Sequence, residues 1–259
     1  MSLPDLLLVT GVVIAAAMVV MWVISLVVRD ASIVDPFWGT GFTIVAWTAV
    51  VAVGEWDAHD LVLAGLVTVW GSRLSIYLLW RSRGKDEDFR YQAMRRRWGA
   101  RFWIVSLGTV FLFQGLLVLV VSLPVQVAVL APGDIGIFTV AGIVIWLVGL
   151  TFETVGDAQL ARFKADPDNS GKVMDRGLWR YTRHPNYFGD FCVWWGVFTV
   201  ALDASGTAWT VIGPLVMSFL LLRVSGVAML EKTVTKRRPG YEEYARRTNA
   251  FFPGPVRNA

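Results

Sequence analysis

Long apolar segments recur along the chain, and they constrain its fold more than any other feature. A helix needs about 20 apolar residues to cross the hydrocarbon core of a membrane. Only 17% of the 259 residues are charged, which is below the level of an ordinary soluble domain. The pattern predicts an all-α, polytopic membrane protein and excludes a soluble globular fold. Seven segments reach or approach the required length: Leu6–Val28, Phe37–Val53, Leu61–Trp80, Phe102–Leu130, Ile135–Thr154, Phe188–Leu202 and Ala208–Leu230.

Basic residues occur in every second connecting segment, and this distribution predicts how the chain is oriented in the membrane. The chain has 24 Lys and Arg residues, and only Arg73 and Arg223 fall inside predicted spans. The others all lie in four segments, residues 29–36, 81–101, 155–187 and 231–259. Basic connecting segments stay on the cytoplasmic side. We therefore expect seven transmembrane helices with the N-terminus outside and the C-terminus inside, in a bacterial cytoplasmic membrane.

Three local features refine this topology. Pro124 predicts a kink or an early end of the fourth span. The basic segment 86–98 predicts a helix on the cytoplasmic membrane surface, and residues 241–247 predict a similar helix or a lid. The first apolar run is too long, and lacks the basic residues, for a cleaved signal peptide. We expect a single membrane domain over residues 1–259.

Few residues suit a metal centre. The chain has one cysteine, Cys192, which excludes a disulfide framework and a cysteine-based zinc or iron–sulfur site. It has only two histidines, His59 and His184. We therefore expect no metal site. Nothing in the sequence indicates nucleic-acid recognition either, because topology accounts for the arginines.

Ionisable residues gather near the cytoplasmic ends of several spans. Arg73 and Arg223 each lie seven residues inside a span, about 10 Å into the hydrocarbon. Charges at this depth normally face a bundle interior or a wet cavity, so we expect a polar chamber open to the cytoplasm. Snorkelling and structural ion pairs are the alternative. The accompanying carboxylates are Asp35, Glu153, Asp157, Asp190 and Glu231.

The densest motif runs from Gly177 to Asp190. Pro185 is suited to the first turn of a helix, and Asn186 and Asp190 then share one face. The free N–H groups of a helix N-terminus favour anions, and basic residues precede it. The motif predicts a site for a phosphate-bearing cofactor, although the same charges also follow from topology or from binding anionic lipids. The basic residues are Lys164, Lys172, Arg176, Arg180 and Arg183.

Residues 183–190, Arg-His-Pro-Asn-Tyr-Phe-Gly-Asp, closely resemble a motif of the sterol C14-reductases. Phe163–Pro167 and the segment from Glu231 through 239–244 to Phe252-Pro253 resemble further parts of the same region. The resemblance covers residues 150–255 and is to the steroid 5α-reductase and sterol reductase superfamily, which includes the isoprenylcysteine carboxyl methyltransferases. Ser32–Gly39 resembles a bacterial branch of uncharacterised function.

The resemblance implies an NADPH-dependent reductase of a C=C bond in a lipid, steroid-like or isoprenoid substrate. The methyltransferases share Arg-His-Pro-x-Tyr but generally lack the equivalents of Asn186 and Asp190, which favours the reductases. The implied cofactor-binding residues are Asp157, Lys164, Arg183, His184, Asn186, Tyr187 and Asp190.

Two residues differ from the pattern of the superfamily in ways that affect the proposed reduction. Trp70 replaces a tyrosine that polarises the carbonyl of the 5α-reductase substrate, and Leu160 replaces a lysine. Tryptophan cannot act as an acid, so another group must supply the proton. The candidates are Asp35 first, then Glu153 and Tyr77; Trp38, Arg73 and Trp70 are candidate substrate-binding residues.

Two other functions remain open. One is an S-adenosylmethionine (SAM)-dependent methyltransferase of the isoprenylcysteine carboxyl methyltransferase type, with the same pocket. The other is a non-catalytic lipid-binding membrane protein, which Trp70 and Leu160 favour. In each case the expected partner is a membrane lipid or a lipid-like small molecule.

Overall fold

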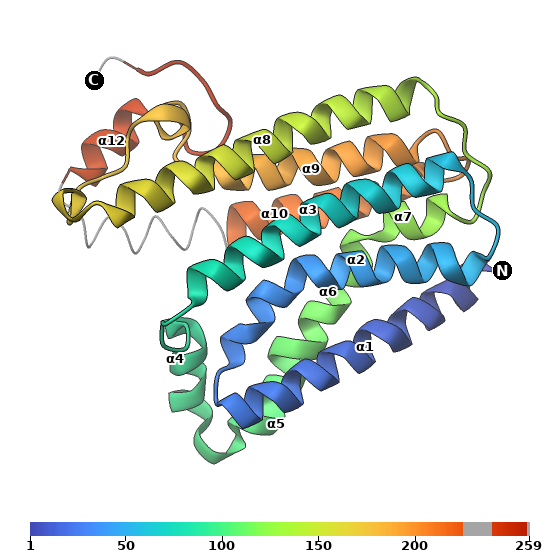
Figure 1. Ribbon diagram of the computed structural model, residues 1–259, viewed down its shortest axis with the longest axis horizontal. Coiled ribbons are helices and arrows are strands. Elements are labelled where there is room, and N and C mark those ends of the chain that lie inside the picture. Colours follow the sequence, from blue (N-terminus) through green and yellow to red (C-terminus); the bar gives the residue numbers. More distant parts are fainter. Residues whose placement is uncertain (225–239, 258–259) are drawn as a thin grey trace. The chain divides into compact units, whose positions relative to one another are not determined.

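The computed structural model describes residues 1–224 and 240–257. Within these ranges every regular element is a helix, as the sequence predicts (Figure 1). The chain divides into two compact units. Unit 1 comprises Met1–Thr139 and Val200–Gly213, and unit 2 comprises Val140–Thr199 and Pro214–Ala259. The reductase-like region 150–255 therefore falls mostly in unit 2.

Three long antiparallel helices form the frame of unit 1 (Figure 1). They are α1 (Leu3–Val28), α2 (Val34–Val53) and α3 (Ala58–Ser82). Each matches a predicted span and begins three residues earlier. Asp57 explains the early start of α3, because its side chain accepts the N–H of Asp60 and caps the first turn.

Two glycines bring α2 and α3 into close contact. A Cβ atom on Gly39 would collide with the carbonyl oxygen of Gly71, and a Cβ atom on Gly71 would collide with that of Gly39. Beside this crossing, the Ser75 hydroxyl accepts the backbone N–H of Thr40 at 2.9 Å. Small residues at such crossings let helix backbones approach each other in membranes.

The fourth predicted span is interrupted at Pro124, as expected. Helical backbone runs through α5 (Phe102–Ser106), a π-helical stretch (Leu107–Leu112) and α6 (Phe113–Val121). A turn at Ser122 then starts α7 (Leu123–Ala128), with Pro124 in its first turn. Before this segment, α4 (Phe89–Trp98) forms the short basic helix predicted within 86–98.

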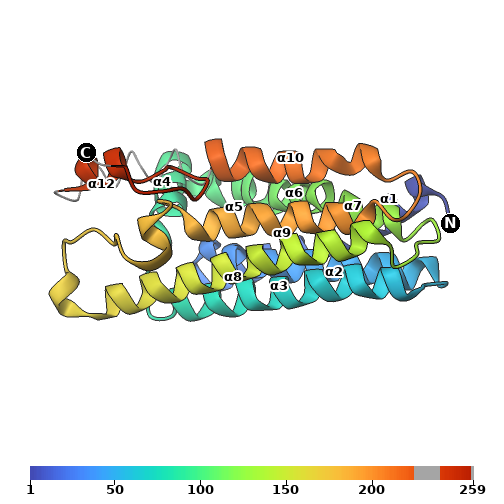
Figure 2. The ribbon, with the colours of Figure 1, turned by 90° about the horizontal axis from the view of Figure 1, so that it is seen from above.

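Two tightly packed helices form the frame of unit 2. Figure 2 shows α8 (Ile137–Ala165) beside α9 (Pro185–Ala201). A Cβ atom on Gly149 would lie 2.6 Å from the Gly189 carbonyl oxygen, so only glycine permits this approach. Helix α8 continues 11 residues beyond the predicted end at Thr154. The prediction ended at the first charged groups, whereas Glu153 and Asp157 are buried inside unit 2.

Among the described residues, five helical segments are long and apolar enough to cross a membrane, as expected of a polytopic membrane protein. They begin at Leu3, Ala31, Ala58, Phe89 and Ile137. Helix α9 and the apolar segment Ala208–Val224, which includes α10 (Ile212–Phe219), are shorter. The predicted end of the last span at Leu230, and Glu231, lie outside the described residues.

Candidate cofactor-binding site

The first turn of α9 is the centre of the candidate site in unit 2. Helix α9 begins at Pro185, as the sequence predicts. The buried His184 precedes it and donates its backbone N–H to the Thr182 hydroxyl at 3.3 Å. Its ring stacks on Tyr187, with the ring centroids 5.6 Å apart. The packing therefore fixes the orientation of both rings at the helix N-terminus.

Asp157 on α8 meets Asn186 on α9. The Asn186 amide donates to the Asp157 carboxylate at 3.1 Å. Gly156 packs against Pro185. The carbonyl oxygen of Gly156 accepts the Trp179 indole N–H at 3.0 Å. Two residues chosen as cofactor ligands from the sequence are thus brought together. Glu153 lies one turn earlier on α8 and is 3% exposed.

Arg183 joins this region to α12 (Tyr241–Arg247), at the predicted position of a second surface helix or lid. Its guanidinium donates to the carbonyl oxygens of Ala245 at 2.6 Å and Thr248 at 2.9 Å. The Tyr244 hydroxyl also donates to the Trp179 carbonyl oxygen. Burial raises the pKa of Tyr244 above its usual range. Arg183 therefore positions the C-terminal segment.

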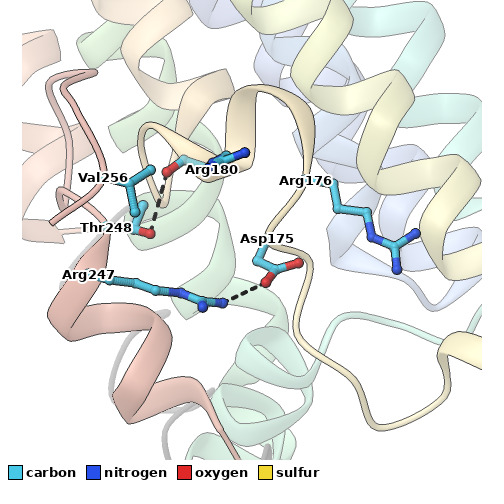
Figure 3. Close-up of a pocket in the computed structure, with 6 residues that line it drawn as sticks. All are labelled: Asp175, Arg176, Arg180, Arg247, Thr248 and Val256. Atoms are coloured by element: carbon cyan, nitrogen blue, oxygen red, sulfur yellow. Dashed lines mark hydrogen bonds and ion pairs between the residues drawn. The ribbon is translucent and has the colours of Figure 1, made fainter. Parts of the chain in front are cut away.

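A cavity of about 260 Å³ lies between this segment and the loop before α9 (Figure 3). Arg247 forms an ion pair with Asp175 at 2.6 Å across it. Three arginines and one aspartate among the lining residues give an excess of positive charge, which suits an anion. Its lining residues are Asp175, Arg176, Arg180, Arg247, Thr248 and Val256.

The sequence predicts some of the residues that line this cavity. Arg176 and Arg180 belong to the basic loop that it identified, but Arg247 and Thr248 were not recognised as site residues. They reach the loop only through long-range contacts of α12, which leave no local pattern in the sequence. Among the other predicted ligands, Lys164 is exposed near the end of α8, and Asp190 lies one turn beyond Asn186.

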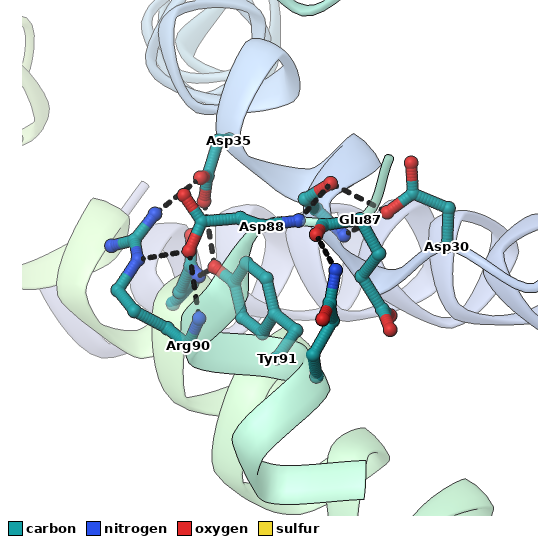
Figure 4. A network of polar contacts seen from close by, with 9 residues as sticks. Asp30, Asp35, Glu87, Asp88, Arg90 and Tyr91 are labelled. Atoms are coloured by element: carbon teal, nitrogen blue, oxygen red, sulfur yellow. Dashed lines mark hydrogen bonds and ion pairs between the residues drawn. The ribbon is translucent and has the colours of Figure 1, made fainter. Parts of the chain in front are cut away.

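Asp35 belongs to a polar network in unit 1 (Figure 4). Its carboxylate accepts from the Arg90 guanidinium at 2.7 Å and from the Tyr91 hydroxyl at 2.6 Å. The Gln114 amide in turn donates to the Tyr91 oxygen at 3.3 Å. Both oxygens of the Asp35 carboxylate therefore accept hydrogen bonds from residues of α4. Arg90 and Tyr91 were not recognised from the sequence.

Glu87 extends the network to the α1–α2 connection. It accepts from Arg95 at 2.8 Å and from the backbone N–H of Ala31 at 2.8 Å. Burial by itself would raise the pKa of Glu87, but these hydrogen bonds and the nearby charge of Arg95 outweigh it and lower the pKa. The predicted cytoplasmic segments 29–36 and 81–101 therefore meet.

The remaining predicted residues of unit 1 lie on α2 and α3. Phe42 contacts the rings of both Trp38 and Trp70, at centroid distances of 5.3 and 5.5 Å. Trp70 is fully buried, so it is part of the helix–helix packing. The Arg73 guanidinium lies over the Tyr77 ring at 5.2 Å. The predicted site residues thus divide between the two units, with Asp35, Trp38, Trp70, Arg73 and Tyr77 in unit 1.

Comparisons with known proteins find an uncharacterised protein and a metal-resistance protein that are similar to this chain. The chain is 24% identical over 270 residues to "Uncharacterized protein C594.04c" of Schizosaccharomyces pombe, covering 90% of this chain and 76% of that protein. It is 29% identical over 107 residues to "Nickel-cobalt-cadmium resistance protein NccN" of Alcaligenes xylosoxydans xylosoxydans. That match covers 41% of this chain and 47% of that protein. No solved structure matches.

The match to a protein family covers most of the chain. A family model described as "Protein of unknown function (DUF1295)" matches residues 21–248. This range contains the last eight residues of α1 and the described helices from α2 to α12. It also contains the Asp35 network and every cavity-lining residue except Val256. The chain therefore belongs to the DUF1295 family of membrane proteins.

Proposed function

We propose that the protein is an NADPH-dependent membrane reductase of a C=C bond in a lipid, steroid-like or isoprenoid substrate. The arginine-lined cavity is the observation that carries this proposal. The resemblance of residues 150–255 to the steroid 5α-reductase and sterol reductase superfamily supports it independently.

The charge of the cavity favours NADPH over S-adenosylmethionine. NADPH carries a diphosphate and a 2′-phosphate, whereas S-adenosylmethionine carries no phosphate and has a positive sulfonium centre. Arginine binds phosphate through paired N–H groups, and Arg176, Arg180 and Arg247 supply three such side chains. A volume of about 260 Å³ suits one phosphate-bearing end of a dinucleotide, because pockets for whole ligands are larger.

The residues of the proposed site fall into groups that would contact different parts of NADPH. NADPH supplies a hydride when bound. The three arginines hold its phosphates, and the Asp157–Asn186 pair offers hydrogen bonds to a ribose or an amide. Asp190, Tyr187, His184 and Lys164 are further binding residues carried over from the resemblance.

The proton that accompanies the hydride must come from this chain or from water. Asp35, Glu153 and Tyr77 are the donors proposed from the sequence. Because Asp35 shares a hydrogen bond of 2.6 Å with the Tyr91 hydroxyl and an ion pair of 2.7 Å with Arg90, we propose that it also orients the Tyr91 hydroxyl. Trp38, Arg73 and Trp70 remain the proposed substrate-binding residues.

The proposed topology has seven transmembrane helices in a bacterial cytoplasmic membrane, with the N-terminus outside and the site open to the cytoplasm. Contacts inside each unit support it. Segments 29–36 and 81–101 meet in unit 1, and Arg183 contacts residues 245–249 in unit 2. Segments expected on one side of the membrane therefore lie together within each unit.

Transfer of tritium from reduced, tritiated NADPH to a membrane lipid extract tests the function. The purified full chain in detergent is compared with Arg180→Ala and Arg247→Ala, which remove guanidinium groups from the cavity. Arg246→Ala is the matched control, because Arg246 is an exposed neighbour that does not line the cavity. We expect transfer by the wild type and the control, and at least a tenfold higher KM for NADPH in the two cavity variants.

Two results would contradict the proposal. Methyl transfer from S-adenosylmethionine without any tritium transfer would favour the methyltransferase. Failure of the folded chain to bind either cofactor would favour a non-catalytic lipid-binding protein.

A further inference from the structure

A second polar cluster lies in unit 1, at the N-terminus of α3. Asp57 and Asp60 form a capping box: the Asp57 carboxylate accepts the Asp60 N–H at 3.0 Å, and the Asp60 carboxylate accepts the Asp57 N–H at 3.2 Å. The second oxygen of Asp57 accepts the backbone N–H of Gly133 at 3.0 Å. These contacts use one carboxylate oxygen of Asp60, whereas its second oxygen accepts no hydrogen bond from them.

His59 lies between the two aspartates in sequence and is fully buried. Its Nε2 atom is 2.9 Å from the carbonyl oxygen of Val200. A carbonyl oxygen can only accept, so Nε2 carries the hydrogen and Nδ1 presents a lone pair in the neutral ring. Histidines that bind metals commonly hydrogen-bond a backbone carbonyl in this way through the second ring nitrogen.

Two acceptor atoms in this cluster are buried with no hydrogen-bond donor from the part of the chain that is described. They are Nδ1 of His59 and Oδ1 of Asp60. One ligand atom from each of Asp57, His59 and Asp60 lies within 4.8 Å of the others. A buried acceptor without a hydrogen-bond donor lowers the stability of the folded protein. We therefore expect a positively charged species between Nδ1 of His59 and Oδ1 of Asp60.

The described segments around this cluster supply no basic side chain to balance its charge. The chain segments that meet here, residues 54–60, 131–136 and 202–207, contain no Lys or Arg. Gly133 also has no side chain, and a Cβ atom there would lie 2.5 Å from His59 Nδ1. The cluster therefore combines two carboxylates and an oriented imidazole without a neutralising group.

We propose that Asp57, His59 and Asp60 bind a divalent first-row transition-metal ion of the Zn²⁺ class. One imidazole nitrogen and carboxylate oxygens suit such an ion. The backbone N–H groups use one lone pair of each bonded Asp57 oxygen and leave the other for the ion. This departs from the expectation, drawn from the scarcity of Cys and His, that the chain has no metal site. The site is independent of the proposed reductase function.

Binding of Zn²⁺ and Co²⁺ to untagged, chelator-stripped full-length protein in detergent tests the proposal. We expect one strong site in the wild type by calorimetry, and nitrogen from one histidine around the ion by X-ray absorption. His59→Gln and Asp60→Asn should each weaken binding on the order of 100-fold. Glu55→Gln is the matched control, because Glu55 is an exposed carboxylate of the same segment, and it should change affinity less than about twofold.

The outcomes separate the possibilities. A site lost in Asp60→Asn, with one histidine in the wild-type spectrum, supports the proposal even if His59→Gln fails to fold. Zn²⁺ affinity that is unchanged in both variants, or absent in the wild type, overturns it. In the latter case a proton shared between Asp60 and His59 satisfies the two acceptors. Gly133→Ala should also weaken binding, because the added methyl group fills the space beside Nδ1.

Discussion

At the residue scale, Asp35 illustrates how a structure reveals partners of a side chain that the sequence does not. From the sequence it was the leading proton donor. The structure joins it to Arg90 and Tyr91, two residues of α4 that the sequence placed on a surface helix without a role in the site. These contacts join residues that are 55 and 56 positions apart in the sequence, and no local pattern encodes them.

Asp35→Ala should destabilise the protein by about 1–3 kcal/mol, because it leaves the buried Tyr91 hydroxyl without its acceptor. It also removes one of the two carboxylates that bind the Arg90 guanidinium, the other being Asp88. Thermal unfolding in detergent measures the effect. Asp86→Ala is the control, since Asp86 is an exposed carboxylate of the same connecting segment. Equal stability of the two variants would show that the network contributes nothing.

Asp203 should make the stability of the folded protein depend on pH in the acidic range. Slight burial would raise its pKa, but the Thr139 hydroxyl at 2.7 Å and the N–H groups of Thr139 and Gly136 outweigh it and lower the pKa below 3.8. A carboxylate with a lowered folded-state pKa stabilises the protein above its unfolded-state pKa, and this contribution disappears as the pH falls through the folded-state pKa.

The melting temperature should therefore fall as the pH drops below about 4, the usual range of an aspartate. Asp203→Asn should lower stability near neutral pH and flatten this part of the profile. Melting curves of the two proteins across the acidic range measure both effects. Parallel profiles for the wild type and the variant would exclude Asp203 as a contributor.

At the element scale, apolar length predicted most helices because hydrophobic matching to the membrane is a local property. Capping at Asp57 and the break before Pro124 are local too, and the latter was anticipated. The extension of α8 was not, because its charged residues become acceptable only when α9 and the loop around Trp179 cover them. The sequence predicts a helix or lid over residues 241–247, but it does not assign Arg247 and Thr248 to the cavity, because only long-range contacts bring them there.

Gly39→Ala and Gly71→Ala should each destabilise unit 1 by roughly 1–3 kcal/mol, the usual cost of overpacking. Each added methyl group would meet a backbone carbonyl that cannot move aside easily. Gly65→Ala on α3 is the matched control, because no atom lies within 4 Å of its added Cβ. Chemical or thermal unfolding compares the three. Helix propensity alone favours alanine over glycine, so Gly65→Ala should not destabilise the protein. An equal loss of stability at Gly65 would contradict the packing explanation.

At the scale of the whole molecule, the topology rests on the distribution of basic residues. Ser2→Cys and Ser170→Cys, each in a Cys192→Ser background, place single exposed cysteines in segments predicted on opposite sides. In intact cells an impermeant maleimide should label the first variant only, and both after permeabilisation. Labelling of Ser170→Cys in intact cells would reverse the orientation.

The most direct test of the central claim is energy transfer from tryptophan to bound NADPH, which uses the 13 tryptophans of the chain as donors. Reduced nicotinamide accepts tryptophan emission, whereas S-adenosylmethionine does not and serves as the competitor. We expect saturable transfer with NADPH, displacement only at high S-adenosylmethionine concentration, and at least tenfold weaker binding in Arg180→Ala. The absence of saturable transfer, or its displacement by S-adenosylmethionine at low concentration, would contradict the proposed NADPH site.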